Sequence, residues 1–227
     1  MNSPAKELKL TEEQQEQVTP VLEKILEAFR TMRWVKNYHR KNASDGGCDS
    51  MSLGMVNRFE HGNGGRFGFY PSVNNTKYPY LFGLLTTLAN LIDFKCSTFC
   101  INRNFQCKMH RDRVNEGESI IVGLGPYKGG EFIIVEENGK RHHFDIRNKF
   151  LQFDGALYLH GTMPFQGERY SIIMYTPATC KSKGEAAHRC RNKELSEEQK
   201  RKRDRSSVQS MQRLIRPDTS DIEAWKK

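Results

Sequence analysis

The chain has 227 residues, of which 37% are hydrophobic, including 13 Phe and 8 Tyr. That length and composition are enough for one compact domain with a substantial core. No apolar run reaches the roughly 18–20 residues of a membrane span, and residues 1–10 lack the apolar core of a signal peptide. Six Cys at irregular spacing predict free thiols in a reducing compartment. The expected location is therefore intracellular, nuclear or cytoplasmic, with no membrane contact.

The net charge of +9 is spread unevenly along the chain. Residues 178–227 contain 14 Lys and Arg against 8 Asp and Glu, so they hold two-thirds of the excess. This basic extension favours a polyanionic partner, and a solvated tail is an equally good interpretation.

A capping box at residues 196–199 predicts a basic helix to about residue 214, with a cluster at 200–205 typical of phosphate contacts or nuclear import. A zinc site at Cys180, His188 and Cys190 is an alternative use of the thiols, although short Cys-x2-Cys pairs are missing.

The first part of the chain predicts a helix that follows a short disordered end. Residues 1–10 are expected to be disordered. Thr11 and Gln14 have the spacing of a capping box, and apolar residues with helical periodicity follow, so a helix is predicted over residues 12–33. Thr19-Pro20 offers a second start, since Pro is tolerated at the first helical position. The apolar stripe of this helix is expected to pack on the outer face of a sheet.

The next segment, residues 37–68, is polar and rich in Gly and Asn, which predicts turns and loops. Loops on a rigid scaffold often carry substrate contacts. Arg58, His61 and Arg66 are therefore candidate contacts, with a solvated loop as the simpler interpretation. A second, more buried helix is predicted over residues 79–93.

From residue 96 the pattern changes to short strands separated by Gly-containing turns. Many short strands with Gly turns favour a sandwich or a jelly roll. The predicted fold class is α+β, with a β core over residues 96–177, packing helices before it and a basic helical tail after it. Strands are predicted over residues 97–102, 119–124, 131–136, 141–146, 149–153, 156–159 and 169–176.

A His-x-Asp pair, His110 and Asp112, lies within this series of strands. His160 follows 48 residues after Asp112, and Arg169 comes nine residues later. Two imidazoles and one carboxylate form the facial triad that suits Fe(II) and leaves positions open for further ligands. Alternate residues of a strand point the same way, so His110 and Asp112 can reach one ion. His160 then has to come from a strand that the fold brings alongside.

Two features compete with this interpretation. His142 and His143 are alternative distal ligands, but they are adjacent in a predicted strand, so at most one could point inward. Arg169 could be an ordinary surface residue on an edge strand. It precedes the apolar run of residues 170–175, however, and a buried guanidinium needs an anionic partner such as a carboxylate.

As a set, these residues resemble the Fe(II)/2-oxoglutarate-dependent dioxygenases, closely over residues 99–177 and loosely over the preceding 50 residues. The resemblance implies a double-stranded β-helix (jelly-roll) core in which His110, Asp112 and His160 bind the iron and act in catalysis. It implies that Arg169 and Ser171 hold the far carboxylate of 2-oxoglutarate, that Asn102 also contacts this co-substrate, and that O2 is the other co-substrate. The motifs look most like the branch that contains the TET and JBP nucleic-acid base oxidases: Phe153-Asp154-Gly155, His160-Gly161-Thr162, Pro164-Phe165 and Gly167-Glu168-Arg169-Tyr170-Ser171.

The resemblance implies that residues 11–177 are a single dioxygenase domain, with 178–227 as a basic extension. The implied reaction is oxidation of a C–H bond with release of succinate and CO2, and the TET/JBP-like motifs imply the methyl group of a modified pyrimidine in DNA or RNA. A duplex substrate would require the base to be flipped into the pocket. The alternatives are a protein side-chain hydroxylase of the same superfamily and a non-catalytic jelly-roll binding module. Aromatic residues over the pocket, for which Phe69 and Tyr70 are candidates, would favour a base over a peptide.

Overall fold

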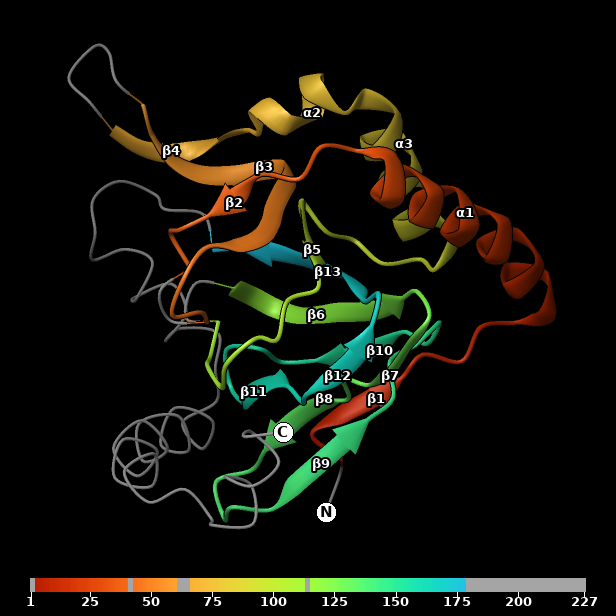
Figure 1. Cartoon of the computed structure of the whole chain (residues 1–227), viewed down its shortest axis with the longest axis vertical. Helices are drawn as coiled ribbons and strands as arrows, with labels where there is room; N and C mark the ends of the chain where they lie inside the picture. The colour runs from red at the N-terminus through yellow and green to blue at the C-terminus, as the bar shows by residue number, and fades with distance from the viewer. Residues whose placement is uncertain (1–2, 41–42, 61–65, 113–114, 179–227) are drawn as a thin grey trace.

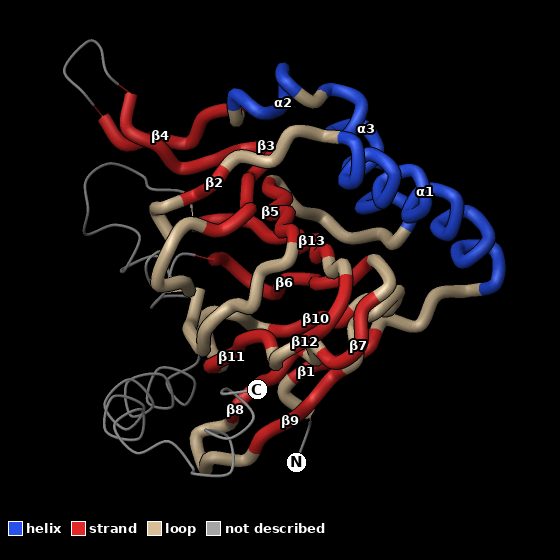
Figure 2. Tube along the Cα trace, in the orientation of Figure 1, coloured by secondary structure: helices blue, strands red, loops and turns tan. Residues whose placement is uncertain are grey.

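The computed structural model describes residues 3–40, 43–60, 66–112 and 115–178. They form a mixed α/β fold in which the strands of the sheets pair antiparallel and the helices lie together on one side (Figures 1 and 2). The helices are α1 (Glu12–Thr31), α2 (Val73–Lys77) and α3 (Pro79–Leu91). The strands are β1 (Ala5–Glu7), β2 (Lys36–Asn37), β3 (Cys48–Glu60), β4 (Arg66–Pro71), β5 (Thr98–Arg103), β6 (Asn115–Leu124), β7 (Tyr127–Gly129), β8 (Phe132–Val135), β9 (Arg141–Phe144), β10 (Leu151–Phe153), β11 (Leu159–Thr162), β12 (Phe165–Gly167) and β13 (Tyr170–Pro177).

The strands form one large sheet and two small ones. The large sheet has the order β1-β10-β6-β13-β5-β3-β2, with β4 pairing to β3. The second sheet has the order β11-β8-β9, and β12 pairs with β7. Neighbours in the large sheet are mostly distant in sequence, so its hydrogen bonds place the first and last described strands, β1 and β13, in one sheet.

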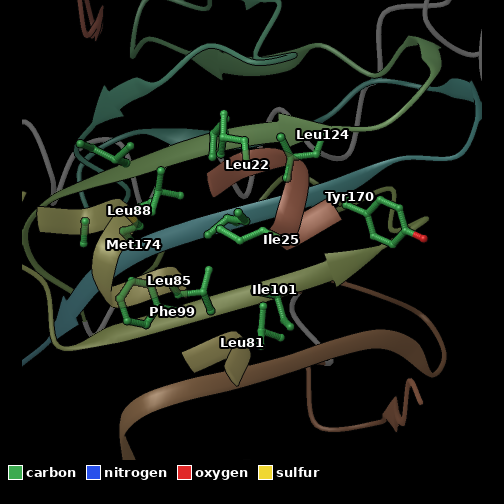
Figure 3. Packing of buried hydrophobic residues seen from close by; sticks show 14 of the residues in the cluster. Leu22, Ile25, Leu81, Leu85, Leu88, Phe99, Ile101, Leu124, Tyr170 and Met174 are labelled. Atoms are coloured by element: carbon green, nitrogen blue, oxygen red, sulfur yellow. The ribbon is translucent and has the colours of Figure 1, made fainter. Parts of the chain in front are cut away.

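The two faces of the large sheet have different coverings because strand residues alternate between faces. On β5, Phe99 and Ile101 face the helices and join a buried cluster with residues of α1 and α3 (Figure 3). Burying each such side chain contributes roughly 1.5–3 kcal/mol. On the opposite face, Ile121 packs in a second cluster with β8 and β10. This second face is where the polar residues of the site gather.

Helix α1 begins with the predicted capping box, in which Thr11 Oγ1 accepts from the Gln14 amide and Gln14 Oε1 accepts from the Thr11 amide. The helix runs without a break through Pro20, so the second start at Thr19 is not used. A proline inside a helix removes one backbone hydrogen bond. Burial of one continuous apolar face outweighs that loss; its members are Val18, Leu22, Ile25 and Phe29.

The expectation that residues 1–10 are disordered is wrong for the described part of that segment. Strand β1 pairs with β10, with Ala5 opposite Phe153, and the Leu8 amide donates to the Phe150 carbonyl at 2.8 Å. An edge strand presents unpaired backbone groups that accept another strand. The composition of residues 1–10 contains no sign of this, because the partner lies far along the chain.

The prediction of loops over residues 37–68 is confirmed for residues 38–40 and 43–47, which lie outside helices and strands, but it is wrong from residue 48 on, where β3 and the start of β4 lie. Strand β3 pairs with β5 on one side and β4 on the other, so its order comes from non-local hydrogen bonds rather than local propensity. Gly54 sits where β3 meets β5, with φ of +86°. A Cβ at this position would approach the Ser97 carbonyl oxygen to 2.3 Å, so the close strand contact requires glycine.

Two smaller differences concern the turns. Residues 126–130, between the predicted strands at 119–124 and 131–136, contain strand β7, which pairs with β12. The predicted strand at 156–159 is mostly a turn, because Asp154 Oδ1 accepts from the amides of Ala156 and Leu157 at 2.9 and 3.0 Å.

None of the described helices has the length and apolar character that crossing a membrane requires. The basic helix, the import cluster and the zinc alternative lie outside the described residues.

Candidate metal centre

The two histidines of the predicted triad face each other across a short antiparallel backbone pairing. His160 lies on β11, and its amide and carbonyl exchange hydrogen bonds with those of His110, each 2.9 Å long. Residues paired in this way carry their side chains on the same side of the pairing. The imidazole ring centres are accordingly 4.5 Å apart.

Hydrogen bonds to backbone carbonyls orient both rings. His110 Nδ1 lies 2.8 Å from the Lys108 carbonyl oxygen, and His160 Nδ1 lies 2.9 Å from that of Tyr158. Because a carbonyl oxygen only accepts, Nδ1 of each ring carries the proton, and Nε2 of the neutral ring keeps its lone pair. Metal-binding histidines in proteins are oriented by this kind of contact.

Asp112 lies between the two Nε2 atoms. Its Oδ1 is 3.4 Å from His110 Nε2 and its Oδ2 is 3.7 Å from His160 Nε2. Single ligand atoms from the three residues all lie within 4.8 Å of one another. The carboxylate is held by the Asn115 side-chain amide at 3.1 Å, and a Cβ at Gly155 would approach Asp112 Oδ2 to 2.9 Å. The spacing and the two-nitrogen, one-oxygen donor set fit a single Fe(II) ion.

The protonation states also suit a metal site. Burial raises the pKa of Asp112, but His110, His160 and Arg40 outweigh it and lower this pKa to about 2. Burial lowers the pKa of His160 to about 4. Burial acts the same way on His110, but Asp112 and Cys107 outweigh it and raise the pKa of His110 to about 10. At neutral pH the metal-free cluster therefore holds one proton beyond those on the two Nδ1 atoms; it lies on His110 Nε2, and a metal ion has to displace it.

A cavity of about 350 Å³ opens beside the three residues, between the large sheet and the β8–β11 pair. Asn102 and Ser171, the predicted co-substrate contacts, are opposite each other on β5 and β13 and both line it. The Asn102 side-chain amide donates to Ser171 Oγ at 3.0 Å. The fold thus brings both residues into one polar row on the cavity face of the sheet.

Arg169 is buried, with 2% of its surface exposed, which excludes the surface alternative. Its guanidinium lies over the rings of Tyr127 and Phe165, with Cζ 5.3 and 5.5 Å from their centres. Its Nε and Nη2 atoms have no hydrogen-bond partner among the described residues. Arg169 is not among the residues that line the cavity. A buried cation with unpaired donors fits a ligand carboxylate.

The competing histidines lie elsewhere. On β9, His142 contacts Glu136, and His143 Nδ1 lies 3.0 Å from Glu131 Oε2. Neither belongs to the cluster around Asp112. Each of these histidines instead pairs with a carboxylate near its own strand.

Of the loop candidates, Arg58 lies on β3 with its Cζ 5.3 Å from the centre of the Tyr70 ring. Phe69 and Tyr70 are half-buried on β4, Arg66 begins that strand, and His61 lies outside the described residues. Tyr70 is paired with Val56, which lines the cavity, so the hairpin borders the site.

Sequence reasoning missed two polar residues of the site. Asn115 contacts Asp112, and Arg40 lines the cavity, where its Nη1 donates to Asn102 Oδ1 at 3.0 Å. Asn115 is only three residues from Asp112, so its closeness in sequence could have predicted that it contacts Asp112. Arg40 is 62 residues from Asn102 in a segment with no motif, and nothing local indicated its place.

Comparison with known proteins found no matching family model and no matching curated protein. The chain is similar in structure to an oxidoreductase of the 2OG-Fe(II) oxygenase family from Burkholderia pseudomallei, with TM-score 0.47 and 14% identity over 76% of this chain and 84% of that one. It is also similar to NgTET1 in complex with 5mC DNA, with TM-score 0.46 and 13% identity over 83% of this chain and 79% of that one. A Trichoplax adhaerens prolyl hydroxylase in complex with a hypoxia-inducible-factor peptide gives TM-score 0.45 and 12% identity over 75% and 81% of the two chains. Similarity at this level carries no argument about function, which has to be inferred from the residues of the site.

Proposed function

We propose that this protein is an Fe(II)/2-oxoglutarate-dependent dioxygenase that oxidises a C–H bond. The observation that carries the proposal is the joint placement of the His110, Asp112 and His160 ligand atoms beside a cavity. A jelly-roll arrangement of the β core would place these residues at one open end. In this proposal the three residues hold the iron, and Arg169, Ser171 and Asn102 hold 2-oxoglutarate.

The chain's own residues prepare the site for this chemistry. The chemistry that the bound iron, 2-oxoglutarate and O2 supply is oxidation of a substrate C–H bond, with succinate and CO2 as products. The rings of Phe132 and Phe153 lie 5.5 and 5.1 Å from the His160 ring and limit the access of water to it. Asp112 stays ionised and His160 stays neutral, which are the forms that bind a metal.

The proposed substrate is a methylated pyrimidine base in DNA or RNA. The TET/JBP-like motifs around His160 and Arg169 support it, and so does the net charge of +9, which favours contacts with phosphates. Arg58 and Tyr70 offer a cationic and an aromatic group on the β3–β4 hairpin, whose Val56 lines the cavity. Aromatic side chains near the pocket suit a base that is stacked out of its strand.

The first experiment is anaerobic addition of Fe(II) and 2-oxoglutarate, followed by the visible metal-to-ligand charge-transfer band. Wild type should show the band, His160→Ala should abolish it, and Arg169→Ala should weaken it by lowering affinity for 2-oxoglutarate. His143→Ala is the matched control, because that histidine pairs with Glu131 away from the cluster. A folded wild type without the band would contradict the proposal.

The substrate is tested separately by release of succinate. Oligonucleotides that contain 5-methylcytosine or thymine, as DNA and as RNA, are compared with peptide libraries. Turnover that depends on the nucleic acid supports a base oxidase. Turnover with peptides alone would keep the dioxygenase and replace its substrate with a protein side chain.

A further inference from the structure

Strand β3 has two halves with different partners. Residues 49–54 pair with β5 inside the large sheet, whereas residues 55–60 pair with β4 alone among the described strands. Gly54, with φ of +86°, lies where the partner changes. The second half of β3 and β4 therefore form a two-stranded hairpin that projects from the large sheet (Figure 1). The base of this hairpin borders the cavity, because Val56 is one of the lining residues.

One face of the hairpin carries an arginine and a tyrosine beyond the cavity. Residues opposite each other in an antiparallel pair point to the same face, and so do residues two apart in one strand. Val56 is opposite Tyr70 and two residues before Arg58, so the three side chains share a face. Two strand residues span about 6.6–6.8 Å. Arg58 is not itself a lining residue, and it therefore lies just outside the cavity mouth.

The Tyr70 ring holds the guanidinium of Arg58 in place. A Cβ at Gly68 would approach Tyr70 Cε2 and the phenol oxygen to 2.7 Å, so this glycine leaves the room that the ring occupies. Gly68 is opposite Arg58, and Arg58 Cζ lies 5.3 Å from the centre of the Tyr70 ring. This is a cation–π contact, which guanidinium groups form by stacking. A group held in this way loses less conformational entropy when a ligand binds.

The charge of Arg58 has no acidic partner on the hairpin. Arg58 is exposed, and among the described residues it forms no ion pair with an Asp or Glu. Residues 55–59 and 67–71 contain no acidic residue at all. The stacked guanidinium keeps its N–H donors at the edge of the plane, where they suit a phosphate. A base that enters the cavity leaves its sugar and the adjoining phosphates at the mouth, which is where Arg58 lies.

We propose that Arg58, stacked on Tyr70, binds a backbone phosphate next to the nucleotide whose base enters the cavity. This inference rests on the proposed function and narrows its substrate to a polynucleotide, since a free nucleoside has no phosphate to place there. Contacts to phosphates fix the position of a strand, whereas contacts to bases select the sequence. Arg58 is thus a positioning residue for the strand, and the cavity selects the base.

The test measures binding to protein loaded with Mn(II) and 2-oxoglutarate, so that no turnover occurs. The probes are fluorescent single strands of about nine nucleotides with a central 5-methylcytosine, as DNA and as 2′-O-methyl RNA. In two further probes of each kind, the phosphate on the 5′ or the 3′ side of this nucleotide is a neutral methylphosphonate.

Arg58→Gln should weaken the unmodified probe about 3- to 10-fold at low salt. It should also reduce the slope of log affinity against log salt by about 1. One of the two methylphosphonates should weaken wild type by a similar factor and leave Arg58→Gln unchanged, because both changes remove the same contact. Tyr70→Leu keeps the charge and removes the ring, so affinity should fall while the salt slope stays. Lys24→Gln is the control, because Lys24 is exposed on α1 away from the cavity and the variant loses the same charge.

Wild-type affinity and salt slope in folded Arg58→Gln would overturn the inference and leave the proposed function standing. Equal losses in Arg58→Gln and Lys24→Gln would refute it too, since net charge alone would then explain binding. Equal methylphosphonate effects in wild type and Arg58→Gln would assign these phosphates to other groups. If wild type binds an acidic peptide through Arg58 but no oligonucleotide, both this inference and the proposed base substrate are wrong. The charge-transfer band of the iron complex tests the dioxygenase itself separately.

Discussion

At the scale of single residues, the proposed metal centre depends on how the carboxylate of Asp112 is held. Asp112 lies between two imidazoles, and its orientation decides whether all three ligand atoms can meet one ion. The buried Asn115 side chain donates to Asp112 Oδ2 at 3.1 Å and lies 3.5 Å from Ser119 Oγ. Asn115 is therefore placed to orient Asp112, one of the three proposed metal ligands.

Asn115→Ala should weaken metal binding by roughly 10- to 100-fold, the usual effect of removing a group that orients a ligand. The measurement is Mn(II) affinity by calorimetry, with circular dichroism to show that the variant is folded. Asn138→Ala is a matched control, because Asn138 lies in the distant β8–β9 turn. Wild-type affinity in Asn115→Ala would show that Asp112 is oriented by other contacts.

A second residue-scale prediction concerns acid stability. Burial raises the pKa of Asp49, but Lys36 and Arg103 outweigh it and hold this pKa below its usual value of 3.8. A lowered folded-state pKa stabilises the protein above the unfolded-state pKa, and this contribution is lost as pH falls through the folded value. Asp49→Asn should therefore lower stability at neutral pH by about 1 kcal/mol, or about 2–4 °C in Tm.

Thermal melts at pH 7 and in the acid range test this expectation. The difference between wild type and Asp49→Asn should shrink as pH falls below about 4, and it should vanish below the folded-state pKa of Asp49, where wild type also lacks the charge. Asp145→Asn is the control, since Asp145 is exposed and its ion pair with the Arg147 guanidinium is 3.7 Å long; an asparagine Oδ1 can still accept the hydrogen bond from the Arg147 amide. A difference that does not change with pH would mean that Asp49 acts through packing.

At the scale of elements, the packing of α1 on the large sheet supports the face that carries the site. Phe29 is fully buried and contacts the rings of Trp34 and Tyr170 at 5.6 and 5.4 Å. Tyr170 follows Arg169 directly and points to the helix side of β13, while Ser171 points to the cavity. Helix packing on one face of β13 therefore holds in place the strand that presents Ser171, a proposed co-substrate residue, on the other face.

Phe29→Ala should lower the free energy of unfolding by roughly 3–5 kcal/mol, the usual cost of a large cavity in a core. Urea unfolding measures it, and Glu27→Ala on the exposed face of the same helix should change little. A loss below about 1 kcal/mol would indicate that the core closes around the missing ring.

At the scale of the whole molecule, the site joins parts of the chain that are distant in sequence. His160 comes from the β11-β8-β9 sheet, whereas Asp112 directly precedes the segment that leads into β6 of the large sheet. A metal bound by both links the two sheets. Because a ligand that binds the folded state stabilises it, metal binding should raise the stability of the whole domain.

Mn(II) at 100 times its dissociation constant should add about 2.7 kcal/mol, which is about 5–11 °C in Tm for a domain of this size. A chelator should reverse the shift, and His160→Ala should show neither effect. The measurement is a thermal melt by circular dichroism with and without metal. An equal shift in wild type and His160→Ala would place the bound metal elsewhere.

The sequence by itself determined the features that depend on neighbouring residues. The capping box and apolar stripe of α1, the second helix and most strands of the β core follow from periodicity and turn residues, which act over a few positions. The order of His110, Asp112, His160 and Arg169 along the chain was also enough to predict the candidate metal site, because a motif is read from the sequence directly.

The tertiary structure alone decided which distant residues meet. Strand β1 pairs with β10, β3 becomes ordered between β4 and β5, and Arg40 reaches Asn102 from 62 residues away. Each of these depends on backbone pairing or desolvation that exists only after the chain has closed on itself. Local propensity does not depend on a partner that is distant in sequence. For that reason the one arginine among the described cavity residues, Arg40, comes from a segment whose composition predicts a polar loop.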